Sequence, residues 1–139
     1  DALAQGATLR LGAAPGASRF VAPIVLDGVT PAMAIWREEI FGPVVAIHRV
    51  RGDAAAIAAA NDTDAGLCAY VMTGDLARAR RVVGQLAVGM VGVNEGLIST
   101  AQAPFGGVKA SGYGREGSRH GLDDYLDYRY VMTTALEHP

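Results

Sequence analysis

The sequence predicts an α/β fold, and two features carry that prediction. Apolar, β-prone runs at residues 44–47, 67–73 and 90–94 alternate with helix-forming segments at residues 53–60 and 76–88. The links between these segments are short, and a strand–helix–strand–helix–strand order with short links is typical of a layered sheet with crossover helices. We therefore expect a mostly parallel sheet.

The composition narrows the classes of protein further. The 139 residues include 12 Lys and Arg against 14 Asp and Glu, which gives a net charge of −2. This balance offers no concentrated basic face, so we expect neither nucleic acid nor a membrane as a partner. The single cysteine cannot form an internal disulfide, and no Cys/His cluster has metal-ligand spacing. We therefore expect no metal site and a cytoplasmic location.

Turn and strand signals define the N-terminal elements. The chain begins at Asp1 rather than at a methionine, and Gly6 follows residues with the pattern of a last helical turn, so we expect a piece of a longer polypeptide. Residues 7–11 and 20–26 are β-prone runs separated by a turn cluster at residues 12–16. This pattern predicts a hairpin or two neighbouring edge strands.

The central elements have clear start and stop signals. A short apolar run at residues 33–36 is followed by a Gly-Pro step at residues 42–43, which predicts a loop before a buried strand at residues 44–47. Asp53 and Asp75 are placed to cap the two helices, because an Asp side chain accepts hydrogen bonds from the first free amides. The expected apolar stripe of the second helix is Leu76, Ala79, Val82, Val83 and Leu86.

Glycines are frequent in the second half of the chain. Gly92 lies inside the strand expected at residues 90–94 and indicates a close backbone approach or a bulge. Residues 96–121 show little periodic pattern, and a loop of this length inside a domain is usually functional or covers another surface. Residues 112–117 match GxGxxG, but no strand leads directly into the motif, so we interpret it as a turn-rich loop rather than a dinucleotide fingerprint. Residues 125–132 alternate as a strand without an obvious partner in this chain.

Few side chains are candidates for reactive or metal-binding roles. Cys68 lies in an apolar run with no neighbouring base, so we expect a small hydrophobic strand residue rather than a nucleophile. His48, His120 and His138 share no ligand spacing, and we expect all three to be structural or solvated.

An acid pair beside an aromatic ring is a more informative candidate. Glu38 and Glu39 precede Phe41 in the loop pinned by the Gly-Pro step. In one interpretation a carboxylate accepts hydrogen bonds from the vicinal diol of a nucleotide ribose while the ring packs on a flat heterocycle. The other interpretation is a solvated turn, and the residues taken alone favour it.

Three segments, taken in order, resemble a known family. They are EEIFGP at residues 38–43, GMVGVN at residues 89–94 and PFGGVKASGYGRE at residues 104–116. Together they resemble the C-terminal part of NAD(P)-dependent aldehyde dehydrogenases, and residues 94–118 are most similar to the succinate-semialdehyde branch. The resemblance covers essentially the whole chain. It implies part of the catalytic domain at residues 1–122 and a C-terminal oligomerisation strand and tail at residues 123–139.

The resemblance implies roles for five residues. Glu39 matches the glutamate that holds the nicotinamide ribose hydroxyls, and Phe41 matches the aromatic residue beside the nicotinamide. Phe105 matches a ring that lines the aldehyde tunnel. Ser99 matches a serine that binds the distal carboxylate of succinate semialdehyde, and a hydroxyl donor suits a carboxylate. Glu116 matches a glutamate assigned to a proton path or to site architecture, and a structural ion pair with a nearby arginine is the alternative.

The resemblance also shows what this chain lacks. In the family a cysteine attacks the aldehyde and a glutamate activates water, and both precede the matching segment. Cys68 follows the acid–aromatic loop and cannot inherit the nucleophile's role. We therefore expect no catalytic residue in this chain and no turnover by the chain alone. The complete enzyme is expected to oxidise succinate semialdehyde to succinate with NAD or NADP and to form a homo-oligomer through the C-terminal strand.

Two alternatives stay open. One is another branch of the family that acts on betaine aldehyde or a longer semialdehyde, since Ser99 is the only residue here that bears on the substrate. The other is a stand-alone, non-catalytic association module. The site chemistry kept at Glu39, Phe41, Ser99 and Phe105 favours the enzyme, because a scaffold does not need it.

Overall fold

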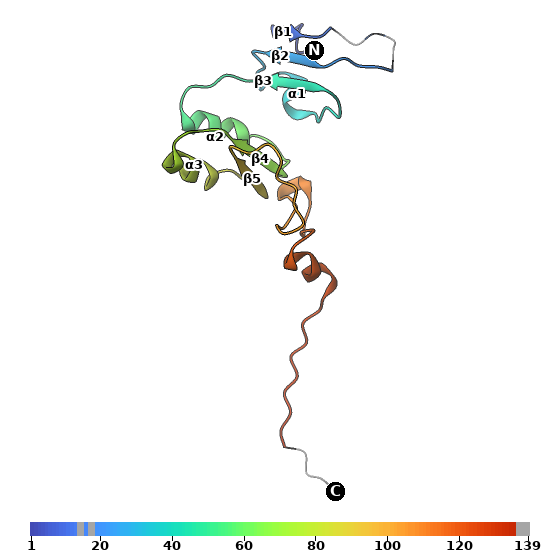
Figure 1. The fold of residues 1–139 in the computed structure, drawn as a ribbon. Helices are drawn as coiled ribbons and strands as arrows, with labels where there is room; N and C mark the ends of the chain where they lie inside the picture. The colour runs from blue at the N-terminus through green and yellow to red at the C-terminus, as the bar shows by residue number, and fades with distance from the viewer. Residues whose placement is uncertain (14–15, 17–18, 136–139) are drawn as a thin grey trace. The chain divides into compact units, whose positions relative to one another are not determined.

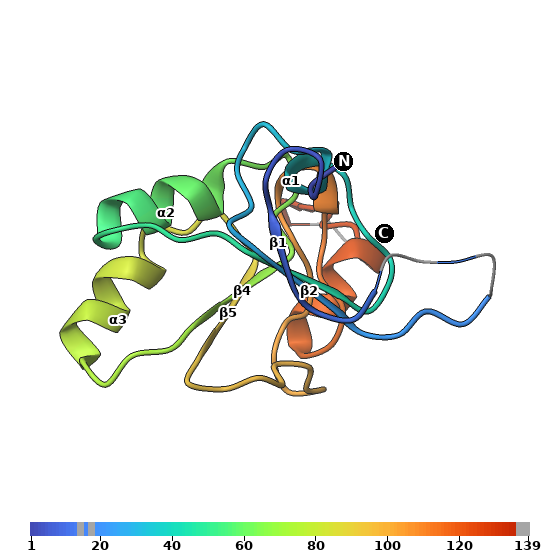
Figure 2. The same cartoon turned by 90° about the horizontal axis from the view of Figure 1, so that it is seen from above.

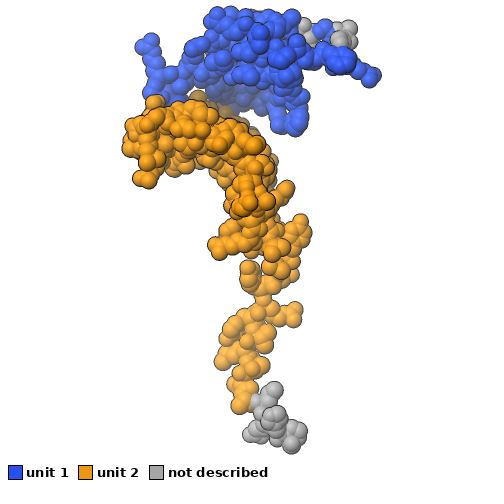
Figure 3. Space-filling view, viewed as in Figure 1, with its two compact units in different colours: residues 1–58 blue, residues 59–139 orange. Residues whose placement is uncertain are grey.

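The computed structural model describes residues 1–13, 16 and 19–135. The chain divides into two compact units, Asp1–Ala58 and Ala59–Pro139, which we call unit 1 and unit 2 (Figure 3). No helix in the described residues combines the length and the apolar character that crossing a membrane requires.

Unit 1 is built on a three-stranded sheet with the order β1–β2–β3 (Figure 1). Its strands are β1 (Thr8–Leu11), β2 (Ile24–Asp27) and β3 (Val44–Ile47). β1 pairs antiparallel with β2, which confirms the two neighbouring strands expected there. β2 pairs in parallel with β3, so the sheet is mixed. Residues 14 and 15 of the expected turn cluster lie outside the described part of the chain.

The core of unit 1 joins the N-terminal turn to β2 and to the segment that leads into helix α1 (Ala34–Arg37). Its buried residues are Ala2, Ala7, Ile24, Leu26, Val29 and Met33. The Ala7 N–H donates to the Ala2 carbonyl at 2.9 Å, and Gly6 has a φ of +99°, as expected for the end of a helical turn. The apolar run at residues 33–36 supplies the first turn of α1 and packs against this core.

β3 is less buried than the sequence predicts. Val45 is 56% exposed, although the sequence predicts a buried strand at residues 44–47. The reason is topological, because β3 is an outer strand of the sheet in unit 1 and only Val44 and Ile47 are half-buried.

A buried carboxylate ties the three strands of unit 1 together. Asp27 is 4% exposed and lies at the end of β2. It accepts hydrogen bonds from Arg10 on β1 at 3.0 and 3.2 Å, and from Arg49, just beyond β3, at 2.9 Å to each oxygen. The hydrogen bonds from Arg49 are the main reason that the pKa of Asp27 falls to about 2; Arg10 lowers it further, while burial opposes the change.

Helix α2 (Asp53–Asn61) covers the helix-forming segment expected at residues 53–60 and includes residues of both units. The Ala56 N–H donates to the Gly52 carbonyl, so Asp53 lies in the first turn and the prediction that it precedes the helix as its cap is wrong. An acidic residue in the first turn still interacts favourably with the helix dipole.

Unit 2 contains the parallel pair β4 (Cys68–Val71) and β5 (Met90–Val93), joined through helix α3 (Leu76–Val83). This strand–helix–strand unit confirms the expected crossover. Asp75 caps α3 as predicted, since its carboxylate accepts from the Arg78 N–H at 3.0 Å. Figure 2 shows α3 beside β4 and β5.

Helix α3 is shorter than the sequence predicts. The pattern predicts a helix that reaches residue 88, but α3 ends at Val83, and its C-cap is Gly84, with a φ of −65°. Ala79 is buried as the apolar stripe requires, whereas Leu76 is 65% exposed at the first helical position. Arg78, Arg80 and Arg81 are exposed.

The remainder of unit 2 is irregular, apart from two short 3₁₀ segments, η1 (Lys109–Ser111) and η2 (Arg119–Tyr125). The GxGxxG segment is the turn-rich loop that was expected: Gly112, Gly114 and Gly117 all have positive φ. The strand expected at residues 125–132 is not formed in the described residues. Tyr125 ends η2 instead, and a strand requires a partner strand to hydrogen-bond with.

Candidate active site

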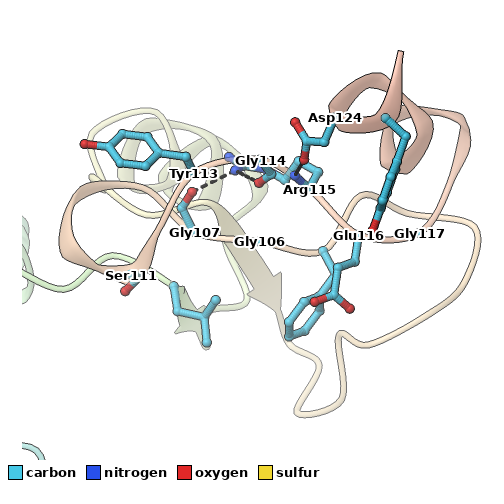
Figure 4. A pocket seen from close by; sticks show the side chains of 13 residues that line it. Gly106, Gly107, Ser111, Tyr113, Gly114, Arg115, Glu116, Gly117 and Asp124 are labelled. Carbon is cyan, nitrogen blue, oxygen red and sulfur yellow. Dashed lines mark hydrogen bonds between the residues drawn. The ribbon is translucent and has the colours of Figure 1, made fainter.

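A cavity of about 420 Å³ lies in the glycine-rich loop of unit 2 (Figure 4). Residues 105–107, 111 and 113–117 form most of its wall, and Leu67 and residues from η2 complete it. The side chains of Phe105, Tyr113, Arg115, Glu116, Asp124 and Tyr125 are among its lining groups. The cavity therefore contains two of the residues that the sequence singled out, Phe105 and Glu116.

Phe105 and Glu116 are held opposite each other by their backbones. The Phe105 N–H donates to the Glu116 carbonyl at 2.8 Å, and the Glu116 N–H donates to the Phe105 carbonyl at 2.7 Å. This single antiparallel bridge fixes both residues at the cavity wall. Phe105 is half-buried, whereas Glu116 is exposed.

Arg115 holds the two sides of the loop together. Its Nη1 atom donates to the Gly107 carbonyl and to the Gly114 carbonyl, both at 2.7 Å, as the dashed lines in Figure 4 show. Glu116 makes no ion pair within the described residues, so the ion pair with a nearby arginine that was its structural alternative is not formed there. Arg115 instead bonds to backbone carbonyls. A charged donor makes stronger hydrogen bonds than a neutral one.

Asp124 packs on the same loop from η2. Its Oδ2 atom accepts from the Arg115 N–H at 3.3 Å. A methyl group added to Gly114, which has a φ of +75°, would overlap the Asp124 carboxylate. Neither Arg115 nor Asp124 was singled out by the sequence. The glycine before Arg115 was the only signal, and it indicated a turn without indicating what fills the space beside it.

Ser99 lies in the loop after β5, and it is exposed. Gly92 is confirmed as a point of close approach, because a methyl group there would lie 2.8 Å from the Glu95 carbonyl oxygen and 2.9 Å from Cδ1 of Tyr70. The loop that leads to Ser99 therefore folds directly over β5.

Glu39 and Phe41 lie in unit 1, in the loop before β3. The Phe41 ring is 98% exposed and Glu39 is also exposed. The backbone around them is fixed: the Val44 N–H donates to the Gly42 carbonyl at 2.8 Å, and the Ile24 N–H donates to the Pro43 carbonyl at 2.9 Å. Because Ser99 and Phe105 belong to unit 2, the expectation that they share one cleft with Glu39 and Phe41 stays a prediction.

The cysteine and two of the histidines contact other parts of the fold or a neighbouring side chain. Cys68 is half-buried in β4, and burial, with a contribution from Cys68, raises the pKa of Tyr70. The Nδ1 atom of His48 lies 2.6 Å from the Val29 carbonyl oxygen, and its ring meets Trp36 edge-on at 4.8 Å. His120 lies 3.4 Å from an Asp123 carboxylate oxygen. His138 lies outside the described residues.

Comparison with known proteins identifies the family. The model of the aldehyde dehydrogenase family matches residues 1–131. The chain therefore belongs to the aldehyde dehydrogenase family, whose members are oxidoreductases, and its α/β fold with mixed and parallel sheets agrees with that assignment.

Two curated relatives show how similar the chain is to particular branches. A mitochondrial succinate-semialdehyde dehydrogenase from Oryza sativa subsp. japonica is 48% identical over 98% of this chain and 26% of its own length. A glutarate-semialdehyde dehydrogenase from Pseudomonas aeruginosa is 46% identical over 98% of this chain and 29% of its own length. The chain thus spans about a quarter of the length of the curated relatives it matches.

Solved structures agree in fold. A succinate-semialdehyde dehydrogenase from Burkholderia pseudomallei superposes with a TM-score of 0.86 at 50% identity, covering 90% of this chain and 26% of that one. A betaine aldehyde dehydrogenase mutant from Staphylococcus aureus, solved in complex with NAD+, gives a TM-score of 0.87 at 37% identity, covering 95% of this chain and 28% of that one.

Proposed function

We propose that this chain is part of an aldehyde dehydrogenase that oxidises succinate semialdehyde to succinate with NAD or NADP. The observation that carries the proposal is the loop of Glu39 and Phe41. A phenylalanine ring that is 98% exposed contributes almost nothing to the core of its own unit, and it lies two residues from an exposed carboxylate on a backbone fixed by hydrogen bonds. This pair fits a flat heterocycle joined to a sugar diol.

In this proposal the loop binds the nicotinamide half of the cofactor. Glu39 accepts hydrogen bonds from the ribose hydroxyls, and the Phe41 ring limits the tilt of the nicotinamide. When bound, the nicotinamide supplies a hydride acceptor. The chain's own residues orient that acceptor and exclude water from one face of it.

Unit 2 supplies part of the substrate wall. Phe105 presents an apolar ring to the aldehyde, and the exposed Ser99 hydroxyl donates a hydrogen bond to the distal carboxylate. Glu116 lies across the bridge from Phe105 and takes a proton-path or architectural role. A longer semialdehyde is the second candidate substrate, because relatives named as glutarate-semialdehyde dehydrogenases are similar to this chain. Its distal carboxylate needs the same kind of hydrogen-bond donor. A betaine aldehyde, whose far end is cationic, does not need a hydroxyl donor there.

Assembly and location complete the proposal. Residues 125–132, within the C-terminal segment 123–139, form a strand only by pairing with another copy of the enzyme, since a strand requires a partner to hydrogen-bond with. Tyr128 and Tyr130 are 89% and 85% exposed in unit 2, so this segment is accessible for such pairing. A monodisperse monomer in light scattering at micromolar concentration would contradict this. The cytoplasmic location also stays a proposal, because the rice relative is named as mitochondrial.

The substrate assignment is tested by comparing aldehydes on the complete enzyme with and without Ser99→Phe. We expect the wild type to favour succinate semialdehyde over butanal, which has the same number of carbons and no carboxylate. The substitution should abolish that preference while butanal turnover survives. An unchanged preference would show that Ser99 does not bind the carboxylate.

A further inference from the structure

Asn94 closes the end of β5 against the end of β4. Its backbone N–H donates to the Val71 carbonyl at 2.9 Å. Its side-chain amide then pairs with the Thr73 backbone in both directions: Nδ2 donates to the Thr73 carbonyl and Oδ1 accepts from the Thr73 N–H, each at 2.8 Å. A side-chain amide in this arrangement offers one donor and one acceptor, as a backbone peptide does, so it extends the ladder beyond Val93.

The chain reverses direction at the pair of side-chain hydrogen bonds between Asn94 and Thr73, which we call the Asn94 clasp. Asn94 has a φ of +54°, in the left-handed region that Asn adopts more readily than most residues. The next residues return over β5, where a methyl group on Gly92 would lie 2.8 Å from the Glu95 carbonyl oxygen and 2.8 Å from Cγ2 of Ile98. The backbone therefore leaves β5 at one fixed point and touches it again at Ile98.

The turn between these points is closed internally. Oε1 of Glu95 accepts hydrogen bonds from the Gly96 N–H at 2.8 Å and from the Leu97 N–H at 3.0 Å. Residues 95–99, which we call the Ser99 loop, thus form a short closed turn. Before this turn, the Asn94 clasp attaches the loop to the sheet. Ser99 itself directly follows Ile98, the residue that packs against Gly92.

We propose that Asn94 is a positioning residue for the Ser99 loop and thereby sets the preference for aldehydes with a distal carboxylate. This inference rests on the proposed function, in which the Ser99 hydroxyl binds that carboxylate. A hydrogen bond weakens steeply when its donor moves or rotates out of line. A shift of the Ser99 loop by about 1 Å therefore removes much of the strength of the hydrogen bond from Ser99 to the carboxylate. An aldehyde without a carboxylate makes no such bond and is insensitive to the shift.

The chain offers a matched control at Asn61. Its Nδ2 atom donates to the Gln85 carbonyl and its Oδ1 atom accepts from the Ala87 N–H, each at 2.8 Å. Asn61 therefore makes the same pair of side-chain-to-backbone bonds in unit 2, at the end of α2 and outside the Ser99 loop. Asn61→Ala removes equivalent hydrogen bonds without releasing the turn after β5.

The experiment compares Asn94→Gly with Asn61→Ala in the complete enzyme. Glycine keeps the left-handed backbone of residue 94 accessible, so this variant removes the clasp alone. We expect both variants to fold, with similar decreases in thermal midpoint. Amide hydrogen exchange of residues 95–99 should accelerate in Asn94→Gly only. Its KM for succinate semialdehyde should rise about tenfold, with kcat and the KM for butanal nearly unchanged.

The outcomes separate the two proposals. Unchanged exchange of the Ser99 loop in Asn94→Gly, or equal kinetic effects of the Asn94 and Asn61 variants, would overturn the positioning role. A third variant, Ser99→Ala, tests the proposed function by itself. If Ser99→Ala leaves the preference for succinate semialdehyde intact while Asn94→Gly still loosens the loop, the carboxylate role of Ser99 is wrong and the structural clasp is right.

Discussion

The guanidinium of Arg115 reaches back across the glycine-rich loop to Gly107, and its Nη1 atom donates to that carbonyl at 2.7 Å. The same atom donates to the Gly114 carbonyl at 2.7 Å, so one side chain joins both sides of the cavity that contains Phe105 and Glu116. The wall of the candidate site thus depends on a residue that was not among those expected to contact substrate or cofactor.

Replacing Arg115 should loosen that wall. We expect Arg115→Ala to lower the free energy of unfolding by about 2 kcal/mol, because two charge-assisted hydrogen bonds are lost. Arg115→Lys should recover part of the loss, since an ammonium group can still donate to one carbonyl. Thermal midpoints of the complete enzyme measure both. Arg119→Ala is the control, since within the described residues the Arg119 side chain makes a long contact of 3.5 Å with His120; an equal loss in the control would contradict this role of Arg115.

Gly114 is predicted to resist substitution for two separable reasons. Alanine at this position is strained by the φ of +75°, at about 1–2 kcal/mol, and its methyl group would also displace the Asp124 carboxylate. We therefore expect Gly114→Ala to destabilise the protein, and Asp124→Ala in the same chain to relieve only the overlap. Gly96→Ala is the matched control, because nothing lies within 4 Å of its added methyl group. Calorimetry that found the Gly114 and Gly96 variants equally stable would refute the predicted strain.

Asp27 is expected to make the stability of unit 1 depend on pH in the acid range. Its carboxyl has a pKa of about 2 in the folded chain, below its ordinary value of 3.8, mainly because of Arg49. A lowered folded-state pKa contributes stability that is complete above the ordinary value and is lost as the pH falls toward 2. Stability measured between pH 4 and pH 2 should therefore decline less steeply in Asp27→Asn than in the wild type, although the variant is less stable at neutral pH.

The two arginines should differ in this measurement. Arg49→Gln removes the largest cause of the lowered pKa and should shift the acid-induced decline toward higher pH. Arg10→Gln removes a smaller one and should shift it less. The reverse order would mean that Arg10 is the main partner of Asp27 in solution.

Local signals in the sequence were sufficient wherever the structure depends on neighbouring residues. The Asp75 cap was predicted because a capping carboxylate acts within three residues, and the close approach at Gly92 was predicted because a glycine inside a strand often marks a place where another backbone comes near. The end of α3 was misplaced because apolar residues continue past Val83, whereas the helix ends there with Gly84 as its C-cap.

Longer-range relationships could not be predicted in the same way. Periodicity gives the alternation at residues 125–132, but strand formation depends on a partner that the alternation does not specify. Likewise, the arginine in the GxGxxG segment was visible, yet only the folded loop brings the Gly107 carbonyl within reach of it. The clasp between Asn94 and Thr73, 21 residues apart, is of the same kind.

The isolated chain should show no dehydrogenase turnover. Covalent catalysis needs an attacking nucleophile, which the family resemblance implies is a cysteine thiolate, and the single cysteine, Cys68, is half-buried within β4. An assay of the chain with succinate semialdehyde and either NAD or NADP should match the blank. Activity above the blank that survives Cys68→Ala would show that the chain carries a reactive group of another kind.

The pair Glu38 and Glu39 provides the sharpest test of the cofactor loop, because we expect only Glu39 to contact the cofactor. Glu39→Gln should raise the KM for NAD or NADP about tenfold, since a neutral amide accepts the ribose hydroxyl bonds less strongly than a carboxylate. Glu38→Gln is the neighbouring control: Glu38 is also exposed, and its backbone N–H ends α1 by donating to the Ala34 carbonyl. Fluorescence titration with the reduced cofactor separates binding from turnover. A weaker affinity in both variants would indicate a general loss of negative charge, whereas a loss confined to Glu39 requires a specific contact between its carboxylate and the cofactor.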